Sequence, residues 1–180
     1  MAGRTTRGPA GEAIAFKDAK AAWAGVAVDV LRVIAGEYGL WVTYQDLAER
    51  VQKATGISTG VAMRNWIGPV LDAVTTAQAG SNEPMLSSLV LHADQTVGPG
   101  FGDAVLLHRG FVPDDLDMHA AVERLECYRY FGADVPNDAS PCLPRTVLLA
   151  RGGAKVFAPR AVCPTCSIEL PRTGVCDNCS

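Results

Sequence analysis

Four cysteines near the end of the chain form two pairs with the same internal spacing. Two residues separate Cys163 from Cys166, nine residues follow, and two residues separate Cys176 from Cys179. A two-residue gap makes a tight turn that directs two thiolates at one point, and two such turns place four sulfurs in a tetrahedral array. The sequence therefore predicts one zinc ion bound by these four cysteines.

The cysteine pairs resemble those of zinc ribbons and related zinc-knuckle modules. Four thiolates leave no open coordination position, so the predicted zinc is structural and not catalytic. Its binding free energy, on the order of 10 kcal/mol, would replace the hydrophobic core that so short a segment lacks. Two disulfides or a redox-active dithiol are the alternative interpretations, and a reducing compartment disfavours the disulfides.

The composition is that of a globular protein with one ordinary domain and a small appendage. Of the 180 residues, 48% are hydrophobic and 19% are charged, and the formal net charge of -3 excludes a strongly basic nucleic-acid coat. The longest apolar region, 21–35, contains Asp29 and Arg32 and is too short to span a bilayer. The first ten residues contain two arginines and no apolar segment, unlike a secretory signal. We therefore expect a cytoplasmic protein.

The first half of the chain has the periodicity of helices. Apolar residues recur every three or four positions, which predicts helices with one buried face. Thr43 is a suitable N-cap for the second helix, and Gly56 marks its end. Pro69 lacks an amide proton and must lie in the first turn of the third helix or at a kink. The expected elements are helices 16–38, 43–56 and 60–80, with a short strand at 40–42.

In the second half of the chain the spacing of the apolar residues changes, and turn-forming residues are more frequent. Apolar runs around a loop with three glycines and a proline predict two strands, and helical spacing then returns. Three prolines and two aspartates mark a linker, and Gly152-Gly153 between two apolar runs predicts a hairpin. The expected elements are strands 86–93 and 104–108 around loop 94–102, helix 114–132, linker 133–144, and hairpin strands 146–150 and 155–158.

This order of elements is that of an α+β winged-helix domain. In a winged helix the third helix enters the major groove and the loop between two strands touches the backbone. Arg64 and Asn65, expected near the start of the third helix, can read bases, and Ser58 and Thr59, expected just before it, suit phosphate contacts. The expected domains are a disordered N-terminus at 1–12, a winged-helix-like domain at 13–132, a linker at 133–144, and a β-hairpin with the four-cysteine zinc module at 145–180.

Residues 42–48 read Val-Thr-Tyr-Gln-Asp-Leu-Ala. This segment resembles the Val-Thr-Tyr-Gly-Glu-Leu-Ala stretch of the alkylguanine-DNA alkyltransferases and alkyltransferase-like proteins, which opens a helix of their DNA-binding winged-helix domain. Looser similarities extend the resemblance over 38–102, and it adds Tyr44 to the expected nucleic-acid contacts. The family's reactive Pro-Cys-His-Arg has no counterpart here, because 89–92 read Leu-Val-Leu-His and Cys142 lies too late in the chain. The resemblance therefore implies the fold and DNA binding, without alkyl transfer.

Three functions stay open at this point. The leading prediction is a protein that binds DNA or RNA as a regulator or accessory factor. The second is a protein-interaction adaptor, because residues 1–142 carry 11 Lys and Arg against 17 Asp and Glu, which weakens the case for nucleic-acid binding. The size of the chain, its lack of catalytic motifs and its small zinc module would suit a protein of phage or mobile-element origin. The third is a metal-dependent nuclease that uses the candidate ligands His92, Asp94, Asp103 and His108. We expect these four side chains not to converge on one ion, and we expect no enzyme activity.

Overall fold

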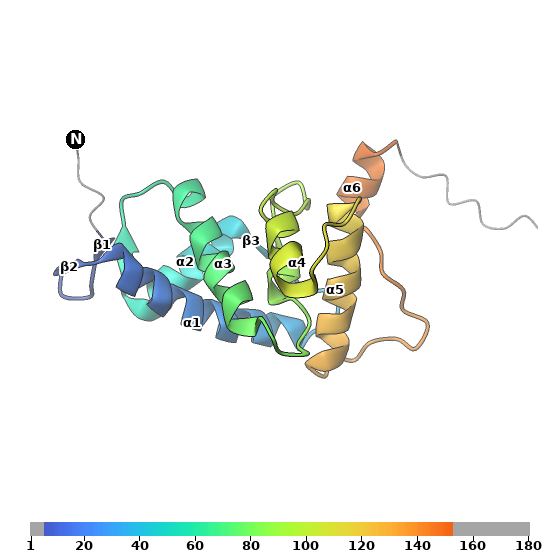
Figure 1. Ribbon diagram of the computed structural model, residues 1–180, viewed down its shortest axis with the longest axis horizontal. Coiled ribbons are helices and arrows are strands. Elements are labelled where there is room, and N and C mark those ends of the chain that lie inside the picture. The colour runs from blue at the N-terminus through green and yellow to red at the C-terminus, as the bar shows by residue number, and fades with distance from the viewer. Residues whose placement is uncertain (1–5, 153–180) are drawn as a thin grey trace, which may run out of the picture. The chain divides into compact units, whose positions relative to one another are not determined.

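The computed structural model describes residues 6–152, and these residues form a mixture of helices and short strands (Figure 1). The α-helices are α1 (Phe16–Ala35), α2 (Tyr44–Thr55), α3 (Ile67–Gln78), α4 (Phe101–Arg109), α5 (Leu116–Tyr130) and α6 (Arg145–Ala150). Two 3-10 helices are η1 (Met63–Asn65) and η2 (Leu86–Leu89). The strands are β1 (Thr6–Arg7), β2 (Ala13–Ile14), β3 (Val42–Thr43), β4 (Ser58–Thr59) and β5 (Val90–Leu91).

The main hydrophobic core lies where α1 packs against α2 and α3. Two fully buried tryptophans lie at its centre, Trp23 of α1 and Trp66 at the start of α3, with ring centroids 4.5 Å apart. The indole nitrogen of Trp23 donates a hydrogen bond to the Ile57 carbonyl, which satisfies its one polar atom inside the core. The predicted helical periodicity is confirmed for α1 and α2. The third helix was expected at 60–80, but it begins at Ile67, so Arg64 and Asn65 lie before it in η1. Pro69 lies in the first turn of α3, where its missing amide proton breaks no hydrogen bond of the helix.

Helix α2 begins and ends as its sequence predicts. The Thr43 side chain accepts a hydrogen bond from the Asp46 amide at 3.0 Å, which satisfies a free donor of the first turn. Gly56 ends the helix in the left-handed conformation with φ 67°, where a residue without Cβ avoids a steric cost. These two caps fix the position of Tyr44, the first residue of α2.

Strands β3 and β5 form a two-stranded parallel sheet, with Val42 opposite Val90 and Thr43 opposite Leu91. The segment before β5 was expected to be part of a longer strand, but its first half forms η2 instead. Its backbone is held by buried side chains. Gln78 accepts from the Leu86 amide, Glu123 accepts from the Met85 amide, and Arg124 donates to the Ser88 carbonyl.

The strand predicted at 104–108 is wrong, because these residues belong to α4. A short apolar run fits a buried strand and a helix equally well. Asp103 lies in the first turn of α4, and Gly110 caps its end in the left-handed conformation. The pair of strands that would form the wing is therefore absent from residues 86–108.

The strand predicted at 146–150 is also wrong, because α6 covers these residues. Disorder is wrong for residues 6–12, where β1 pairs antiparallel with both β2 and β4. Residues 133–144 contain no helix or strand, as expected of a linker, but they belong to the same compact unit as the helices, and the boundary of that unit follows Val147.

Within residues 6–152, no helix combines the length and the apolar composition that are needed to cross a bilayer. The predicted hairpin strand 155–158 and the predicted zinc ligands lie outside the described residues.

Candidate functional site

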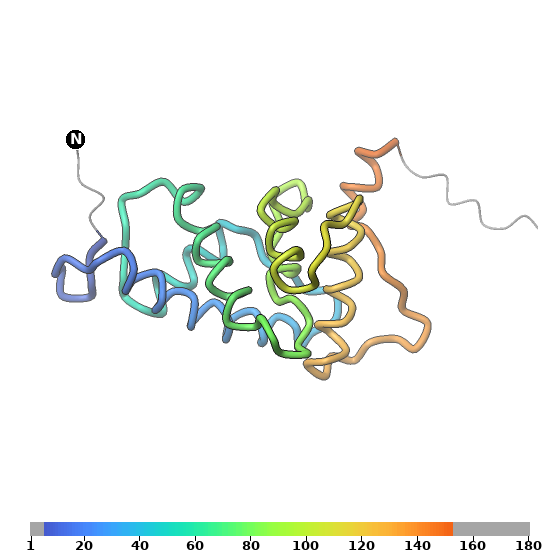
Figure 2. Tube along the Cα trace, viewed as in Figure 1, coloured from blue at the N-terminus to red at the C-terminus, as the bar shows by residue number. Residues whose placement is uncertain are grey.

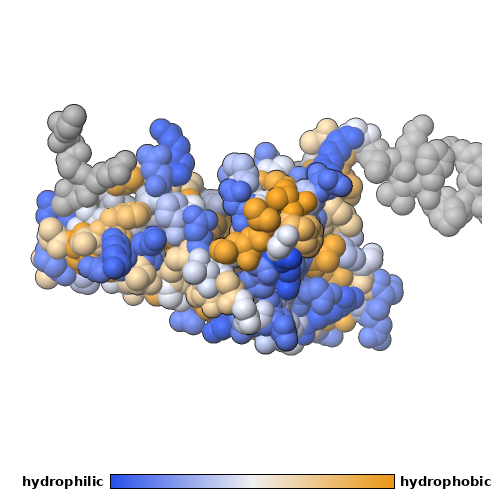
Figure 3. Space-filling view, in the orientation of Figure 1, coloured by the Kyte–Doolittle hydropathy of each residue, from blue (hydrophilic) through white to orange (hydrophobic). Residues whose placement is uncertain are grey.

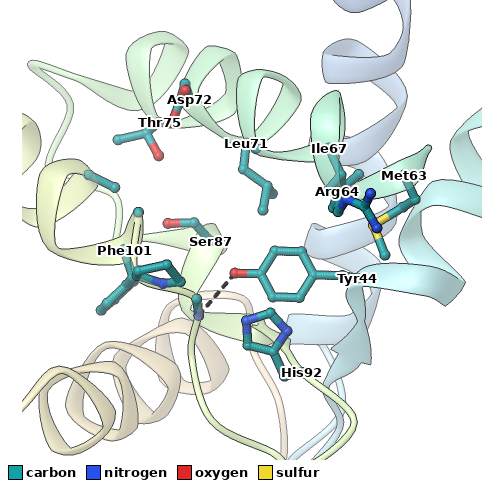
Figure 4. A pocket seen from close by; sticks show the side chains of 15 residues that line it. Tyr44, Met63, Arg64, Ile67, Leu71, Asp72, Thr75, Ser87, His92 and Phe101 are labelled. Atoms are coloured by element: carbon teal, nitrogen blue, oxygen red, sulfur yellow. Dashed lines mark hydrogen bonds between the residues drawn. The ribbon is translucent and has the colours of Figure 1, made fainter. Parts of the chain in front are cut away.

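A pocket of about 340 Å³ opens between α3, the start of α2, η1, η2 and the loop before α4. We call it the α3 pocket, and Figure 4 shows it from close by. Helix α3 packs against α4 at this place, and the glycines of the Gly98-Pro99-Gly100 loop let the backbone run along the pocket wall. The side chains labelled in Figure 4 are Tyr44, Met63, Arg64, Ile67, Leu71, Asp72, Thr75, Ser87, His92 and Phe101.

Tyr44 extends across the α3 pocket and is fixed at both its ring and its hydroxyl (Figure 4). The hydroxyl oxygen accepts a hydrogen bond from the Gly98 amide at 3.1 Å, and the ring lies against His92 with centroids 4.6 Å apart. A Cβ atom at position 98 would lie 2.4 Å from this hydroxyl, so the contact requires glycine. Burial raises the pKa of Tyr44, which outweighs the opposite effect of the Gly98 amide. The Tyr44 hydroxyl therefore stays protonated and can donate its own hydrogen to a ligand.

Two buried hydroxyls at the α3 pocket have no hydrogen-bond partner among the described residues. They are Thr75 Oγ1 of α3 and Ser87 Oγ of η2, whose residues are 1% and 6% exposed. A buried hydroxyl without a partner costs about 1–3 kcal/mol, so each would gain from a polar atom of a ligand. In Figure 4 both oxygens lie between α3 and Phe101. No described histidine or carboxylate hydrogen-bonds to Ser87, so it lacks the general base that a serine nucleophile needs.

The charged groups among the described lining residues lie at the rim of the α3 pocket. Arg64 is exposed and forms no hydrogen bond or ion pair with another described residue. In the middle of α3, burial and the nearby charge of Asp103 raise the pKa of Asp72, and Lys20 lowers it. The rim is therefore cationic beside η1 and anionic beside α4, while the interior is apolar with neutral hydroxyls.

The structure brings together only part of the predicted nucleic-acid site. Tyr44 and Arg64 both line the α3 pocket. Ser58 and Thr59 form β4, which pairs with β1, and the Thr59 hydroxyl accepts from the Val61 amide. Asn65 is exposed on η1 but does not line the pocket.

The predicted nuclease ligands are distributed over several places. His92 lies against Tyr44, Asp94 accepts hydrogen bonds from Thr96, and Asp103 and His108 lie on α4. Among the residues that the structure describes, no three His, Cys, Asp or Glu side chains are grouped so that they could bind one metal ion. The four predicted zinc ligands Cys163, Cys166, Cys176 and Cys179 lie outside the described residues.

Sequence reasoning missed Thr75, Ser87, Gly98 and Phe101, which complete the α3 pocket. Ser87 comes directly after two apolar residues, in a segment whose sequence predicts a strand. In a strand its side chain would point in another direction than it does in the 3-10 helix η2. The three glycines around Pro99 were a usable signal, because a glycine-rich loop often marks a close approach of the backbone to another group.

No protein-family model, curated protein or solved structure matches this chain.

Proposed function

We propose that the domain binds nucleic acid at the α3 pocket, with one unstacked base in the pocket. The observation that carries the proposal is the arrangement of Tyr44 and Arg64 around an apolar cavity with two hydroxyls, where neither Arg64 nor either hydroxyl has a partner within residues 6–152. Proteins that recognise unpaired nucleotides combine these features: an aromatic surface, hydrogen-bonding groups for the base edge and a cation for the backbone.

The interior of the α3 pocket fits a base better than it fits an ion or a sugar. A base has apolar faces, which suit Leu71, Phe101 and the Tyr44 ring. Its edge carries neutral donors and acceptors, which suit the hydroxyls of Thr75 and Ser87, since a hydroxyl can donate and accept. The absence of a charged side chain inside the described pocket disfavours a ligand whose charge would have to be buried there.

The electrostatics support weak and local binding. Arg64 is the cation of the described pocket rim, and Asp72 in the middle of α3 and Asp103 on α4 would repel phosphates on the α4 side of the pocket. Counterion release scales with the number of neutralised phosphates, so one or two contacts reduce the binding constant by only about one to two orders of magnitude per tenfold increase in salt.

The test is fluorescence anisotropy with labelled oligonucleotides of equal length: a matched duplex, the same duplex with one mismatch, and a single strand. We expect the single strand and the mismatch to bind more tightly than the matched duplex, because less stacking and pairing is lost. Arg64→Ala should weaken binding, and Ala104→Leu should reduce the preference for the mismatch because it fills the pocket.

Arg50→Ala is the matched control. Arg50 is an exposed arginine of α2 with no hydrogen bond or ion pair among the described residues, and the substitution removes the same charge. Equal losses of affinity in the Arg64 and Arg50 variants would reject the α3 pocket as the site. Absence of binding to all three oligonucleotides at low salt would reject nucleic-acid binding.

Two further points support a winged-helix type of domain as part of this proposal. The order α1, β3, α2 and then α3 is that expected for the first part of a winged helix, although β4 and η1 lie between α2 and α3. The alkyltransferase-like segment 42–48 lies at the start of α2 and contributes Tyr44 to the pocket. Helix α4 replaces the second strand of the expected wing, so the proposed class differs from the usual domain at that point.

We also propose that the cysteine pairs of residues 163–180 bind one structural zinc ion. The proposal rests on their spacing, which suits four-thiolate coordination. Metal analysis of the reduced protein should find close to one zinc per chain, and Cys176→Ser should lose it. Metal-free wild-type protein would reject the proposal.

Protein binding is the second candidate function, because one side of the domain exposes a group of large apolar residues. Figure 3 shows apolar surface over the region of α4. The exposed residues on α4 and just after it are Leu106, Leu107, Phe111 and Val112. Exposed apolar clusters of this kind often mark protein interaction sites. A protein partner that is captured after nuclease treatment by the wild type, and lost with Leu107→Glu, would favour this function over nucleic-acid binding.

A further inference from the structure

A second pocket, of about 310 Å³, lies between α5 and the segment that follows it. Figure 2 traces residues 133–144 from the end of α5 back to α6, and this return forms one wall of the pocket. We call it the Arg124 pocket. Among the described residues, it shares no lining residue with the α3 pocket. The residues that matter for the argument are Tyr38, Trp41, Arg124, Tyr128, Cys142 and Arg145.

Arg124 is a buried cation without a direct carboxylate partner in the described chain. Its residue is 6% exposed, and its one hydrogen bond within residues 6–152 is from NH1 to the Ser88 carbonyl at 3.1 Å. None of the ion pairs in that range includes Arg124, and Asp117 attracts it only at longer range. Burial lowers the pKa of Arg124, and Tyr128 and Asp117 partly oppose this effect. A guanidinium has five N–H donors, so most of them stay available to a ligand.

The other described residues that line the Arg124 pocket include a second arginine and no carboxylate. Arg145, at the start of α6, is exposed, and the neighbouring Thr146 hydroxyl holds this end of α6 to the loop after β5, 2.6 Å from Gln95 Oε1. No aspartate or glutamate is among the described lining residues. An apolar pocket with two arginines and no carboxylate favours an anion, because buried charges require a partner of opposite sign.

Aromatic side chains form the remaining surface of the Arg124 pocket. Tyr38 and Tyr128 pack edge to face with centroids 5.5 Å apart, and Trp41 lies beside them along the wall. The Tyr128 hydroxyl donates to the Leu40 carbonyl, which fixes its ring. These rings can pack against the planar body of a ligand while the arginines bind its charged group.

We propose that the Arg124 pocket binds a small aromatic anion, with its carboxylate or phosphate oxygens on Arg124 and Arg145 and its ring against Trp41 and Tyr38. Carboxylates and phosphates share the geometry that a guanidinium recognises with two parallel hydrogen bonds. The site is independent of nucleic-acid binding at the α3 pocket, and its ligand is a free small molecule.

The probes are benzoate and phenyl phosphate, with benzyl alcohol as the uncharged analogue of similar size. The full-length protein is titrated while Trp41 fluorescence is followed, and Trp41→Phe identifies the signal of this tryptophan against the buried Trp23 and Trp66. We expect both anions to bind and benzyl alcohol to bind at least about tenfold more weakly. Equal affinity for the alcohol, or no binding of either anion at about 10 mM, would overturn the proposal.

Three variants test the assignment of the residues. Arg124→Met should weaken anion binding by about tenfold or more, because a charged hydrogen bond is lost from a buried place. Arg145→Ala should weaken it by about threefold, because this arginine is exposed. Arg50→Ala removes the same charge from α2, outside the described pocket lining, and should leave affinity unchanged. Because Arg145 is exposed, its variant tests the proposal even if Arg124→Met does not fold. Unchanged affinity in Arg145→Ala and in any folded Arg124→Met protein would overturn it.

Cys142 gives an independent readout inside the Arg124 pocket. Its thiol is exposed, whereas Cys127 is fully buried and its pKa is raised by burial to about 12. Saturating phenyl phosphate should slow the alkylation of Cys142 by iodoacetamide several-fold, as measured for each cysteine by peptide mass spectrometry, and should leave Cys127 unreactive. An unchanged Cys142 rate at saturation would place the bound anion elsewhere and overturn the proposal.

Discussion

Glu123 and Arg124 are neighbours on α5, and both are buried, but their surroundings differ. Consecutive residues of a helix point about 100° apart, so the two side chains meet different parts of the fold. Glu123 accepts two hydrogen bonds from Arg109, each 2.9 Å long, and a third from the Met85 amide. Arg124 has one hydrogen bond within the described chain, to the Ser88 carbonyl, and borders the Arg124 pocket.

This difference in hydrogen-bond partners distinguishes a buried charge that stabilises the fold from one that is available to a ligand. Glu123 is satisfied within the described chain and joins α4, the segment before η2, and α5, so its role is structural. Arg124 has N–H donors without a partner in the described chain and lines a pocket, which is the arrangement expected for ligand binding. A buried charge whose partners are incomplete lowers stability without a ligand, and that loss is the physical reason to expect one.

The largest effect is expected for Glu123→Gln, which removes the charge of a buried carboxylate that pairs with the partly exposed Arg109. We expect a loss of about 3 kcal/mol in the free energy of unfolding, because Arg109 loses its counter-charge and the Met85 amide loses a strong acceptor. Urea denaturation followed by circular dichroism measures the difference.

Glu126→Gln is the control on the same helix. Glu126 pairs with Arg129 at 2.9 Å, but both side chains are about half exposed. A surface pair contributes about 0–1 kcal/mol, so this variant should be close to wild type. If the two glutamate variants lose equal stability, Glu123 does not have the structural role described above.

The sequence predicted the helical part of the fold well and the α3 pocket in part. The helix caps at Thr43 and Gly56 are local, so they could be read from nearby residues. Helix α4 could not be distinguished from a strand, because its short apolar run has no diagnostic period. The conformation of η2 depends on hydrogen bonds from Gln78, Glu123 and Arg124, which are distant in sequence.

The same limit applies to the two pockets. Tyr44 was expected as a functional residue from the family resemblance and Arg64 from its place near the predicted third helix, and both line the α3 pocket. The Arg124 pocket could not be predicted, because a single arginine on an amphipathic helix reads as an exposed residue. Arg124 is buried because η2 and residues 133–144 pack against it, and no local sequence pattern predicts that packing.

The second prediction is a pH dependence that comes from Glu123. Burial by itself would raise its pKa, but the hydrogen bonds from Arg109 and the Met85 amide, with the charges of Arg109 and His119, outweigh burial and lower the pKa of Glu123. The unfolded chain has a glutamate pKa of about 4.3. The contribution of Glu123 to stability is therefore complete above that pH and is lost as the pH falls through it toward the lower folded pKa.

The difference in unfolding free energy between wild type and Glu123→Gln should accordingly shrink as the pH falls from about 7 to about 3. Asp94, whose pKa is lowered by its hydrogen bonds to Thr96, titrates in both proteins and cancels in the difference. A difference that stays constant over this range would show that the charge of Glu123 is not the source of the stability.

The smallest effect on stability is expected for Arg124→Met, although the side chain is as deeply buried as Glu123. The substitution leaves the Ser88 carbonyl without its donor, which costs about 1–2 kcal/mol. It also removes a buried charge that has no direct carboxylate partner in the described chain, which offsets part of that cost, and methionine fills most of the same space. We therefore expect a net loss of about 1 kcal/mol or less in the free energy of unfolding, measured by urea denaturation, well below that of Glu123→Gln.

The stabilities of the two variants can be compared directly, since each variant removes one charge from the same helix. A loss in Arg124→Met equal to that in Glu123→Gln would mean that Arg124 is held for stability, and the contrast between a structural charge and a ligand-binding charge on α5 would be wrong.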